Sequence, residues 1–350
     1  MGPTMARLRR LQRQLTMRVQ FDQHRMHALL LLPLFVIISL CLLWPAHPAP
    51  STSKTVYFVS IGDHGTGLPD QLSVAHQMAD VASKRNAQFV LTLGDNFYPR
   101  GIEGLDDPLI RTHFEDIYED MSLQIPWYVT LGDHDHRGSV AAQIAYSNYS
   151  SRWEMPAPYY VKHIALGEKH HMDLIITDSI GLEGAIAAKY NETRRFEQDY
   201  TMEFTGKEAG LKQLQWLTEV LRTSTANWRV VVGHRPLQSC GNRARFPVEE
   251  RLRSLLLPLF VKHRVHVYIH GHDHLGQHLV DEGVVYVGNG VGGFGTHRAS
   301  ATNNTIWFSN DYLGFIVHKV TPSQLDFKFK NNKGKTLHQI KLRHIDESDI

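Results

Sequence analysis

Short apolar runs rich in β-branched residues recur along the chain, and several of them end at a Gly-Asp or Gly-His pair. Apolar runs of about four to eight residues, bounded by turn residues, are typical of buried strands. Strands of this kind are predicted over Val56–Ile61, Phe89–Leu93, Trp127–Leu131, Arg229–Val232 and Val265–Ile269. Because glycine lets the backbone turn sharply, the residue after each run is expected to point into a crevice at the strand end.

Apolar residues with helical spacing lie between several of these runs. They predict helices over Gln71–Arg85, Pro108–Asp120, Lys207–Arg222 and Val248–His263. Strands that alternate with helices are typical of βαβ units. Towards the carboxyl end only strands are predicted, over Val284–Val287, Leu313–Val320, Gln324–Lys330 and Thr336–Leu342. We therefore expect residues 54–345 to form one α/β domain, a four-layer α/β/β/α sandwich of two mixed sheets flanked by helices.

The amino-terminal segment has a different pattern. Residues 28–43 are uncharged and almost entirely aliphatic, and residues 1–27 before them contain six arginines. By the positive-inside rule, this predicts a basic cytosolic tail over 1–27, a signal-anchor helix over 28–44 and a linker over 45–53. The chain would then be a single-pass type II membrane protein of the secretory or endolysosomal pathway or the cell surface, with a lumenal or extracellular domain. The alternative is a cleaved signal peptide and a secreted protein.

Three glycosylation sequons agree with entry into the secretory pathway, at Asn148, Asn191 and Asn303. The composition, 42% hydrophobic and 21% charged, is that of a globular chain and excludes a multi-span membrane protein. The formal net charge is +2, of which residues 1–27 contribute +5, so the remainder carries −3. The folded part therefore has no overall positive field, and no nucleic-acid partner is expected.

The chain contains 22 histidines, which favours a metal site because histidine is the commonest metal ligand. Functional groups of open α/β sheets gather at the carboxyl ends of the strands. The groups expected there are Asp63, Asp95, Tyr98, Asp133, His134, His234, His272 and His274. Unpaired carboxylates packed together would raise one another's pKa, and a pair of metal ions with a bridging carboxylate removes that repulsion.

Five motifs in a fixed order carry a family resemblance. They are Gly62-Asp63-His64-Gly65, Gly94-Asp95-Asn96-Phe97-Tyr98, Gly132-Asp133-His134-Asp135, Val231-Val232-Gly233-His234 and Gly271-His272-Asp273-His274. This order resembles the calcineurin-like metallophosphoesterases. Tyr98 in the second motif narrows the resemblance to their purple acid phosphatase branch, close to the tartrate-resistant acid phosphatases, over about residues 55–340.

The resemblance implies a binuclear metal centre of Fe(III) and a divalent Fe, Zn or Mn ion. Asp63, Tyr98 and His274 would bind the ferric ion, and Asp95 would bridge both metals. The divalent ion would be held by Asp133, His234 and His272. The implied reaction is acid phosphatase hydrolysis of phosphate monoesters, such as phosphoproteins, nucleotides or small phosphates, by attack of a metal-bound hydroxide. His134 would be the proton donor to the leaving group.

The chain also departs from the family pattern. Asp133 stands where the family has an asparagine ligand, Arg235 replaces an aromatic residue, and a second catalytic histidine is missing. Arg235 and Arg243 are expected to hold the substrate phosphate and to offset the added charge of Asp133. The alternative is a catalytically attenuated phosphatase fold that serves as a membrane anchor or scaffold.

The other histidines match no ligand spacing. We expect surface residues or hydrogen-bonded core residues at His76, His113, His163, His170, His171 and His263. The glycine-rich stretch Gly288–Gly295 opens no predicted helix, so it is not a dinucleotide-binding motif.

Overall fold

The computed structural model describes residues 53–189, 202–242 and 247–344. The predicted anchor over 28–44, the sequon at Asn191 and the predicted phosphate ligand Arg243 lie outside these residues. Within them, no helix has both the length and the apolar character needed to cross a bilayer.

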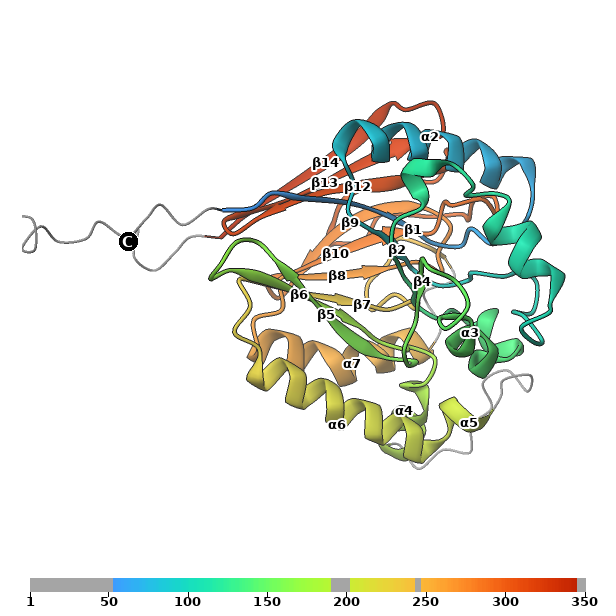
Figure 1. Cartoon of the computed structure of the whole chain (residues 1–350). Coiled ribbons are helices and arrows are strands. Elements are labelled where there is room, and N and C mark those ends of the chain that lie inside the picture. The colour runs from blue at the N-terminus through green and yellow to red at the C-terminus, as the bar shows by residue number, and fades with distance from the viewer. Residues whose placement is uncertain (1–52, 190–201, 243–246, 345–350) are drawn as a thin grey trace, which may run out of the picture. The chain divides into compact units, whose positions relative to one another are not determined.

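Two seven-stranded mixed sheets form the centre of the molecule (Figure 1). In the first, the strand order is β14-β13-β12-β1-β2-β3-β4, with β1 to β4 parallel and β12 to β14 antiparallel to their neighbours. Its strands are β1 (Val56–Ile61), β2 (Val90–Thr92), β3 (Trp127–Tyr128), β4 (Trp153–Glu154), β12 (Gly314–Thr321), β13 (Gln324–Asn331) and β14 (Thr336–Arg343).

The second sheet has the order β11-β9-β10-β8-β7-β6-β5, in which β10, β8, β7 and β6 are parallel. The outer strands β11, β9 and β5 run antiparallel to their neighbours. Its strands are β5 (Tyr160–Ala165), β6 (His171–Ile176), β7 (Trp228–Val232), β8 (Val267–His270), β9 (Gly276–Asp281), β10 (Val284–Asn289) and β11 (Thr305–Ser309).

Helices cover the outer faces of both sheets (Figure 1). Helix α2 (Pro69–Arg85) lies on the first sheet, and α4 (Glu183–Lys189), α6 (Lys207–Thr223) and α7 (Pro247–Lys262) lie on the second. Shorter helices are α3 (Val140–Tyr146) and α5 (Met202–Thr205). The predicted four-layer α/β/β/α architecture is therefore confirmed.

Two apolar cores hold the layers together. The larger core joins the facing sheets and contains buried strand residues such as Val59, Leu91 and Ile269. The smaller core joins the second sheet to its helices through residues such as Leu217 and Leu252. On α6 the buried positions Gly210, Gln213, Leu217 and Leu221 recur every three or four residues, as expected for one buried face of a helix.

Three local predictions differ from the structure. The predicted helix over 108–120 is one π-helical turn at Ile110–Glu115, followed by a short 3-10 turn at Met121–Leu123. The predicted strand over 127–131 pairs only at Trp127–Tyr128, because the chain then bends away towards the next glycine. Strands β4, β5, β6, β9 and β11 were not predicted, and in β5 and β6 polar residues such as His163 and Asp173 interrupt the apolar pattern.

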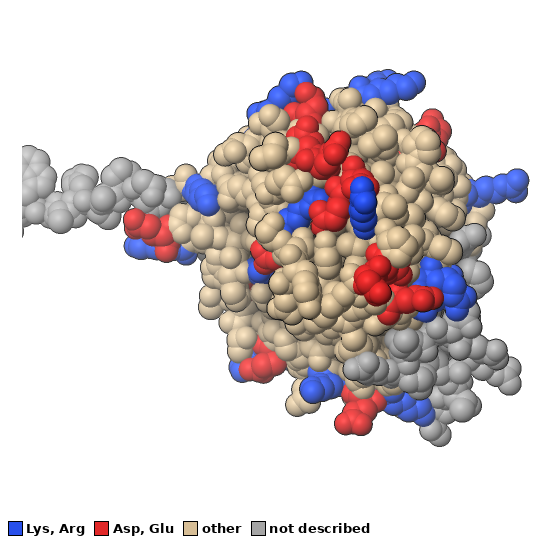
Figure 2. Space-filling view, turned by 45° about the vertical axis from the view of Figure 1, so that its right-hand side comes forward, with Lys and Arg blue, Asp and Glu red and all other residues tan. Residues whose placement is uncertain are grey.

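The described surface carries charges of both signs. On the face drawn in Figure 2, acidic and basic side chains are interspersed among uncharged ones.

Candidate metal centre

The predicted site residues lie where parallel strands of the two sheets end. Asp63 and Asp95 follow β1 and β2, and Asp133 lies in the loop after β3. His234 follows β7, and His272 follows β8. Since these strand ends face one another across the two sheets, residues up to about two hundred positions apart in sequence come together.

Unusual backbone conformations aim several of these side chains. Asp63, Asp95 and His272 all have positive φ, at 55°, 54° and 68°. This region is uncommon for residues other than glycine, and such conformations concentrate at functional sites. Each of the three residues thus turns back immediately after its strand and directs its side chain towards the space between the sheets.

Glycines next to the ligands leave room for this close approach. A Cβ atom added to Gly94, which has φ of +90°, would lie 2.5 Å from Nδ1 of His234. A Cβ atom added to Gly132 would lie 2.2 Å from Oδ1 of Asp95. The glycine in these Gly-Asp motifs is therefore required by packing against a site residue that follows another strand, as well as by the turn.

One group of donors is rich in oxygen. The phenol oxygen of Tyr98 lies 2.8 Å from Oδ2 of Asp95 and 3.4 Å from both Oδ1 of Asp63 and Nε2 of His274. Nε2 of His274 lies 3.3 Å from Oδ1 of Asp63. The backbone N–H of His272 donates to both oxygens of Asp63, which fixes that carboxylate in place.

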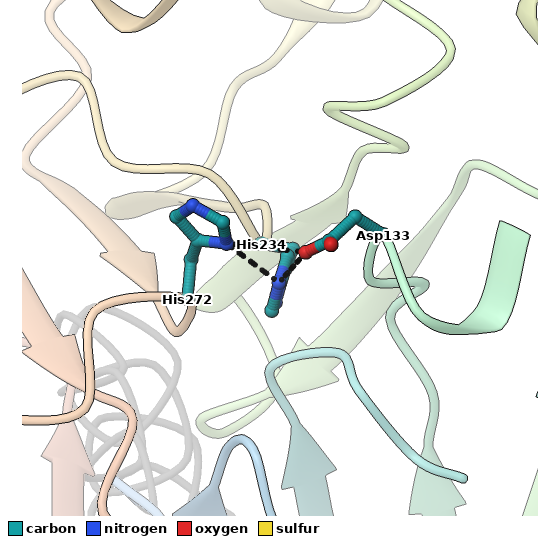
Figure 3. A group of neighbouring side chains, drawn as sticks. All are labelled: Asp133, His234 and His272. Atoms are coloured by element: carbon teal, nitrogen blue, oxygen red, sulfur yellow. Dashed lines mark hydrogen bonds and ion pairs between the residues drawn. The ribbon is translucent and has the colours of Figure 1, made fainter. Parts of the chain in front are cut away.

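The second group contains two imidazoles and a carboxylate (Figure 3). Oδ1 of Asp133 lies 3.1 Å from Nε2 of His234 and 3.1 Å from Nδ1 of His272. The two imidazole nitrogens are themselves 3.3 Å apart. Nδ1 of His234 donates to the carbonyl of Leu93 at 2.8 Å, which leaves Nε2 as the atom that faces the site.

Asp95 lies between the two groups. Its Oδ2 faces Tyr98, whereas its Oδ1 accepts from the backbone N–H of His134 and lies 3.4 Å from Nε2 of His234. Two sets of side chains that could hold a metal ion, Asp63–Asp95–His234 and Asp133–His234–His272, each place their donor atoms within 4.8 Å of one another. The described residues therefore contain two overlapping groups that suit a pair of metal ions.

The electrostatics of the pocket also fit bound cations. Burial, together with the negative charges of Asp133 and Asp63, raises the pKa of Asp95. Burial and the charge of Asp95 raise the pKa of the Tyr98 phenol well above its usual value. Burial alone would raise the pKa of Asp63, but the hydrogen bond to His274 and the charges of His234, His274 and His272 together outweigh it and lower that pKa to about 2. Cations among these buried oxygens would relieve the repulsion and allow the phenol to ionise.

His134 differs from most of the candidate ligand side chains in its exposure. Its side chain is 22% exposed, compared with 6% or less for those of Asp133, Asp63 and His274. Nδ1 lies 2.6 Å from the carbonyl of Pro99, and this acceptor places the proton on Nδ1. Nε2, 3.9 Å from Oδ2 of Asp133, is then the atom turned towards the site.

The comparisons with known proteins agree with this geometry. A family model described as calcineurin-like phosphoesterase matches residues 57–276. The chain belongs to this family. Tartrate-resistant acid phosphatase type 5 of Oryctolagus cuniculus is 34% identical to this phosphoesterase over 322 residues, covering 87% of this chain and 94% of that protein. Purple acid phosphatase 4 of Arabidopsis thaliana is 32% identical over 313 residues, covering 86% of this chain and 88% of that protein.

Solved structures share the fold of this phosphoesterase. The structure described as GAP50, the anchor in the inner membrane complex of Plasmodium, has a TM-score of 0.72 at 24% identity and covers 85% of this chain and 91% of that one. Purple acid phosphatase PPD1 from yellow lupin (Lupinus luteus) seeds has a TM-score of 0.61 at 16% identity. The match covers 86% of this chain and 56% of that one. At these identities the likeness shows the fold alone.

Arg235, which was predicted to hold the substrate phosphate, lies in a buried ion-pair cluster of the phosphoesterase. Arg235 donates from Nε to Glu183 at 2.8 Å and from Nη1 to Glu249 at 3.2 Å, and all three residues are buried. Nη1 also lies 3.2 Å from Nε2 of His272. The charge of Arg235 is therefore compensated by two carboxylates, and its contact with the site runs through His272.

Two residues next to the candidate ligands were not predicted. Arg137 donates from Nη2 to Oδ2 of Asp133 at 3.2 Å, and His297 stacks on His274 with ring centroids 3.9 Å apart. Arg137 follows Asp133 by four residues in one loop, a spacing that the sequence does show. His297 comes from a distant loop, so only the fold reveals its position.

Proposed function

We propose that this phosphoesterase is a binuclear, metal-dependent acid phosphatase that hydrolyses phosphate monoesters. The observation that carries the proposal is the arrangement of two donor groups that share His234 and have Asp95 between them, at the strand ends of the two sheets. The near full-length similarity to acid phosphatases supports the reaction class.

Each donor group suits a different ion. Carboxylate and phenolate oxygens suit a hard trivalent ion, so we assign Fe(III) to Asp63, Tyr98 and His274. Imidazole nitrogens suit divalent Fe, Zn or Mn, so we assign that ion to Asp133, His234 and His272, with Asp95 shared. When bound, the two ions supply Lewis acidity towards the phosphoryl oxygens and a lowered pKa for a nearby water.

His134 is the proposed proton donor to the leaving alcohol. The carbonyl of Pro99 holds the proton on Nδ1, so in the doubly protonated ring the second, transferable proton is on Nε2. The ring also packs edge-on against Tyr98 at 4.4 Å between centroids, which fixes its orientation beside the oxygen-rich group. Its partial exposure gives the site a route for proton exchange with solvent.

Positive charge near the substrate is proposed to come from the arginines of the site. Arg235 acts chiefly by orienting His272, because Glu183 and Glu249 already accept its hydrogen bonds. The positive charge of Arg137 offsets the negative charge of Asp133. Phosphate binding by Arg243 stays a prediction.

The second candidate function is an attenuated enzyme that serves as a membrane anchor or scaffold. Two observations favour it. Asp133 adds a negative charge where a phosphate dianion would have to bind. Buried Glu183 and Glu249 accept hydrogen bonds from Arg235 and so compensate the positive charge that would otherwise attract the phosphate. GAP50, a structural neighbour, is described as an anchor in a membrane complex. Both candidates keep residues 28–44 as a proposed type II anchor, with the domain in a lumenal or extracellular space.

Metal analysis and a visible spectrum of the purified full-length chain test the metal assignment. We expect close to two metals per chain, at least one of them iron, and a visible charge-transfer band that Tyr98→Phe abolishes without loss of the fold. An iron-free, colourless protein with full phosphatase turnover would contradict the assignment of Tyr98.

A further inference from the structure

A second group of metal-ligating side chains lies on strands β5 and β6. The two strands pair antiparallel, with His163 directly opposite Asp173 and Ala165 opposite His171. His171 and Asp173 are two residues apart on β6, so their side chains project from the same face of the sheet. Cross-strand pairing thus adds the imidazole of His163 to the imidazole and carboxylate that the spacing of His171 and Asp173 already places together.

The donor atoms of this group converge. Nδ1 of His163 lies 2.7 Å from Oδ1 of Asp173, and Nε2 of His171 lies 3.5 Å from the same oxygen. All three atoms lie within 4.8 Å of one another. In a tetrahedral zinc site with bonds of roughly 2.0–2.1 Å, ligand atoms are about 3.3 Å apart. The two distances from the imidazoles to Asp173 lie on either side of that spacing.

The group combines a fixed anchor with accessible ligands. The side chain of Asp173 is 3% exposed, whereas those of His163 and His171 are 70% and 31% exposed. The second oxygen of Asp173 accepts a hydrogen bond from the hydroxyl of Ser224, which sets the orientation of the carboxylate. Ligand carboxylates held in this way by an outer partner are typical of metal sites.

The group is separate from the candidate metal centre. His171 is the first residue of β6, which runs parallel to β7. The centre lies beyond the carboxyl end of β7, at His234. Asp173 and His171 therefore lie at the opposite end of the second sheet, next to its edge strand β5.

We propose that His163, His171 and Asp173 form a peripheral site for a borderline divalent metal ion, Zn²⁺ in particular. Two imidazole nitrogens and one carboxylate oxygen are a ligand set that Zn²⁺ accepts, and the fourth position faces solvent. The bound ion would tie edge strand β5 to β6. The positive charge of Arg229 interacts with Asp173. It would therefore repel a bound cation and lower the affinity of the site for the metal ion.

Zinc binding by the full-length chain, with its binuclear centre loaded, tests this site. Zn²⁺ is titrated in competition with a chromophoric chelator, and the metals bound per chain are counted before and after. The variants are His163→Ala and His171→Ala. The matched control is His170→Ala, because His170 neighbours the group but hydrogen-bonds to Asn227 instead. These residues have no role in the proposed phosphatase reaction. Turnover of p-nitrophenyl phosphate therefore reports whether the binuclear centre stays loaded.

The wild-type chain and His170→Ala are expected to bind one zinc ion beyond the centre and to melt at a higher temperature when it is added. His163→Ala and His171→Ala are expected to weaken this binding at least tenfold and to remove the thermal shift, with turnover unchanged. Equal zinc binding by His163→Ala and the wild type would overturn the proposal. So would a loss in His170→Ala as large as that in His163→Ala.

Discussion

Arg137 donates a hydrogen bond from Nη2 to Oδ2 of Asp133 at 3.2 Å, within one loop after β3. The other oxygen of this carboxylate faces His234 and His272. One aspartate can thus serve as a ligand on one side and as an ion-pair partner on the other. The added negative charge, where the resemblance implies asparagine, has a compensating cation four residues away.

This pair predicts coupled effects on catalysis. Arg137→Gln should lower kcat/KM for p-nitrophenyl phosphate by about tenfold, or about 1.4 kcal/mol, because Asp133 would then repel the phosphate dianion without compensation. In the Asp133→Asn background the same change should have little effect, since the charge to be compensated is gone. Steady-state kinetics of both single variants and the double variant measure the coupling.

Arg111→Gln is the matched control, because Arg111 pairs with Asp116 on the exposed surface. It should leave kcat/KM unchanged. Additive effects of Arg137→Gln and Asp133→Asn would show that the two side chains act independently at the site.

Arg235 should matter for stability. Arg235→Gln removes the cation that Glu183 and Glu249 share, and breaking a buried ion pair costs about 3–5 kcal/mol. We expect urea unfolding at pH 7 to show a loss of that size in the free energy of unfolding. Burial raises the pKa of Glu249 and Arg235 opposes that rise, so protonation of Glu249 in the variant should make the loss smaller at pH 5.

A partly exposed ion pair provides the comparison. Arg253 pairs with Asp281, and its side chain is 34% exposed. Arg253→Gln should cost less than about 1 kcal/mol. If the two arginine variants lose the same stability, the buried cluster has no special role in the fold.

Buried His318 should make the domain less stable in acid. Its Nε2 lies 2.8 Å from the hydroxyl of Ser60, its ring stacks on Phe58, and burial lowers its pKa to about 3. The folded state keeps His318 neutral, whereas the unfolded chain binds a proton below pH 6.5. The stability that His318 contributes is therefore complete above pH 6.5 and is lost as the pH falls towards 3, by about 1.4 kcal/mol per pH unit.

Urea unfolding at pH 6.5 and pH 4.5 measures this effect. The wild type should lose about 2–3 kcal/mol more between these values than His318→Asn, which cannot take up the proton. His76→Asn, at an exposed position on α2, should behave like the wild type. An unchanged pH dependence in His318→Asn would contradict the assignment.

Much of the fold could be predicted because short stretches of the sequence determine its strands and turns. Several strands of the α/β part, such as β1, β2 and β7, are followed by a glycine and then a polar residue, so the gathering of Asp63, Asp95 and His234 follows from the general behaviour of parallel sheets. The π-helical turn at Ile110–Glu115 has the same apolar spacing as an ordinary helix. Only its packing distinguishes the two.

Other features depend on pairing and docking that no local pattern records. Glu183 from α4 and Glu249 from α7 meet Arg235 only after both helices dock on the second sheet. His163 and His171 come together through the register of β5 and β6, although each looks like an isolated surface histidine in the sequence. Register and docking are set by the packing of the whole core, so these relationships became visible only in the structure.

Turnover of p-nitrophenyl phosphate by Asp95→Asn and the wild type, each with its metals counted, tests the central claim most directly. Asp95 lies between both donor groups, so the variant should lose at least one metal and about a thousandfold in kcat/KM at acid pH. The wild type should hold two metals and turn over. A wild-type chain with two metals and no more activity than Asp95→Asn would contradict the phosphatase account and favour the scaffold.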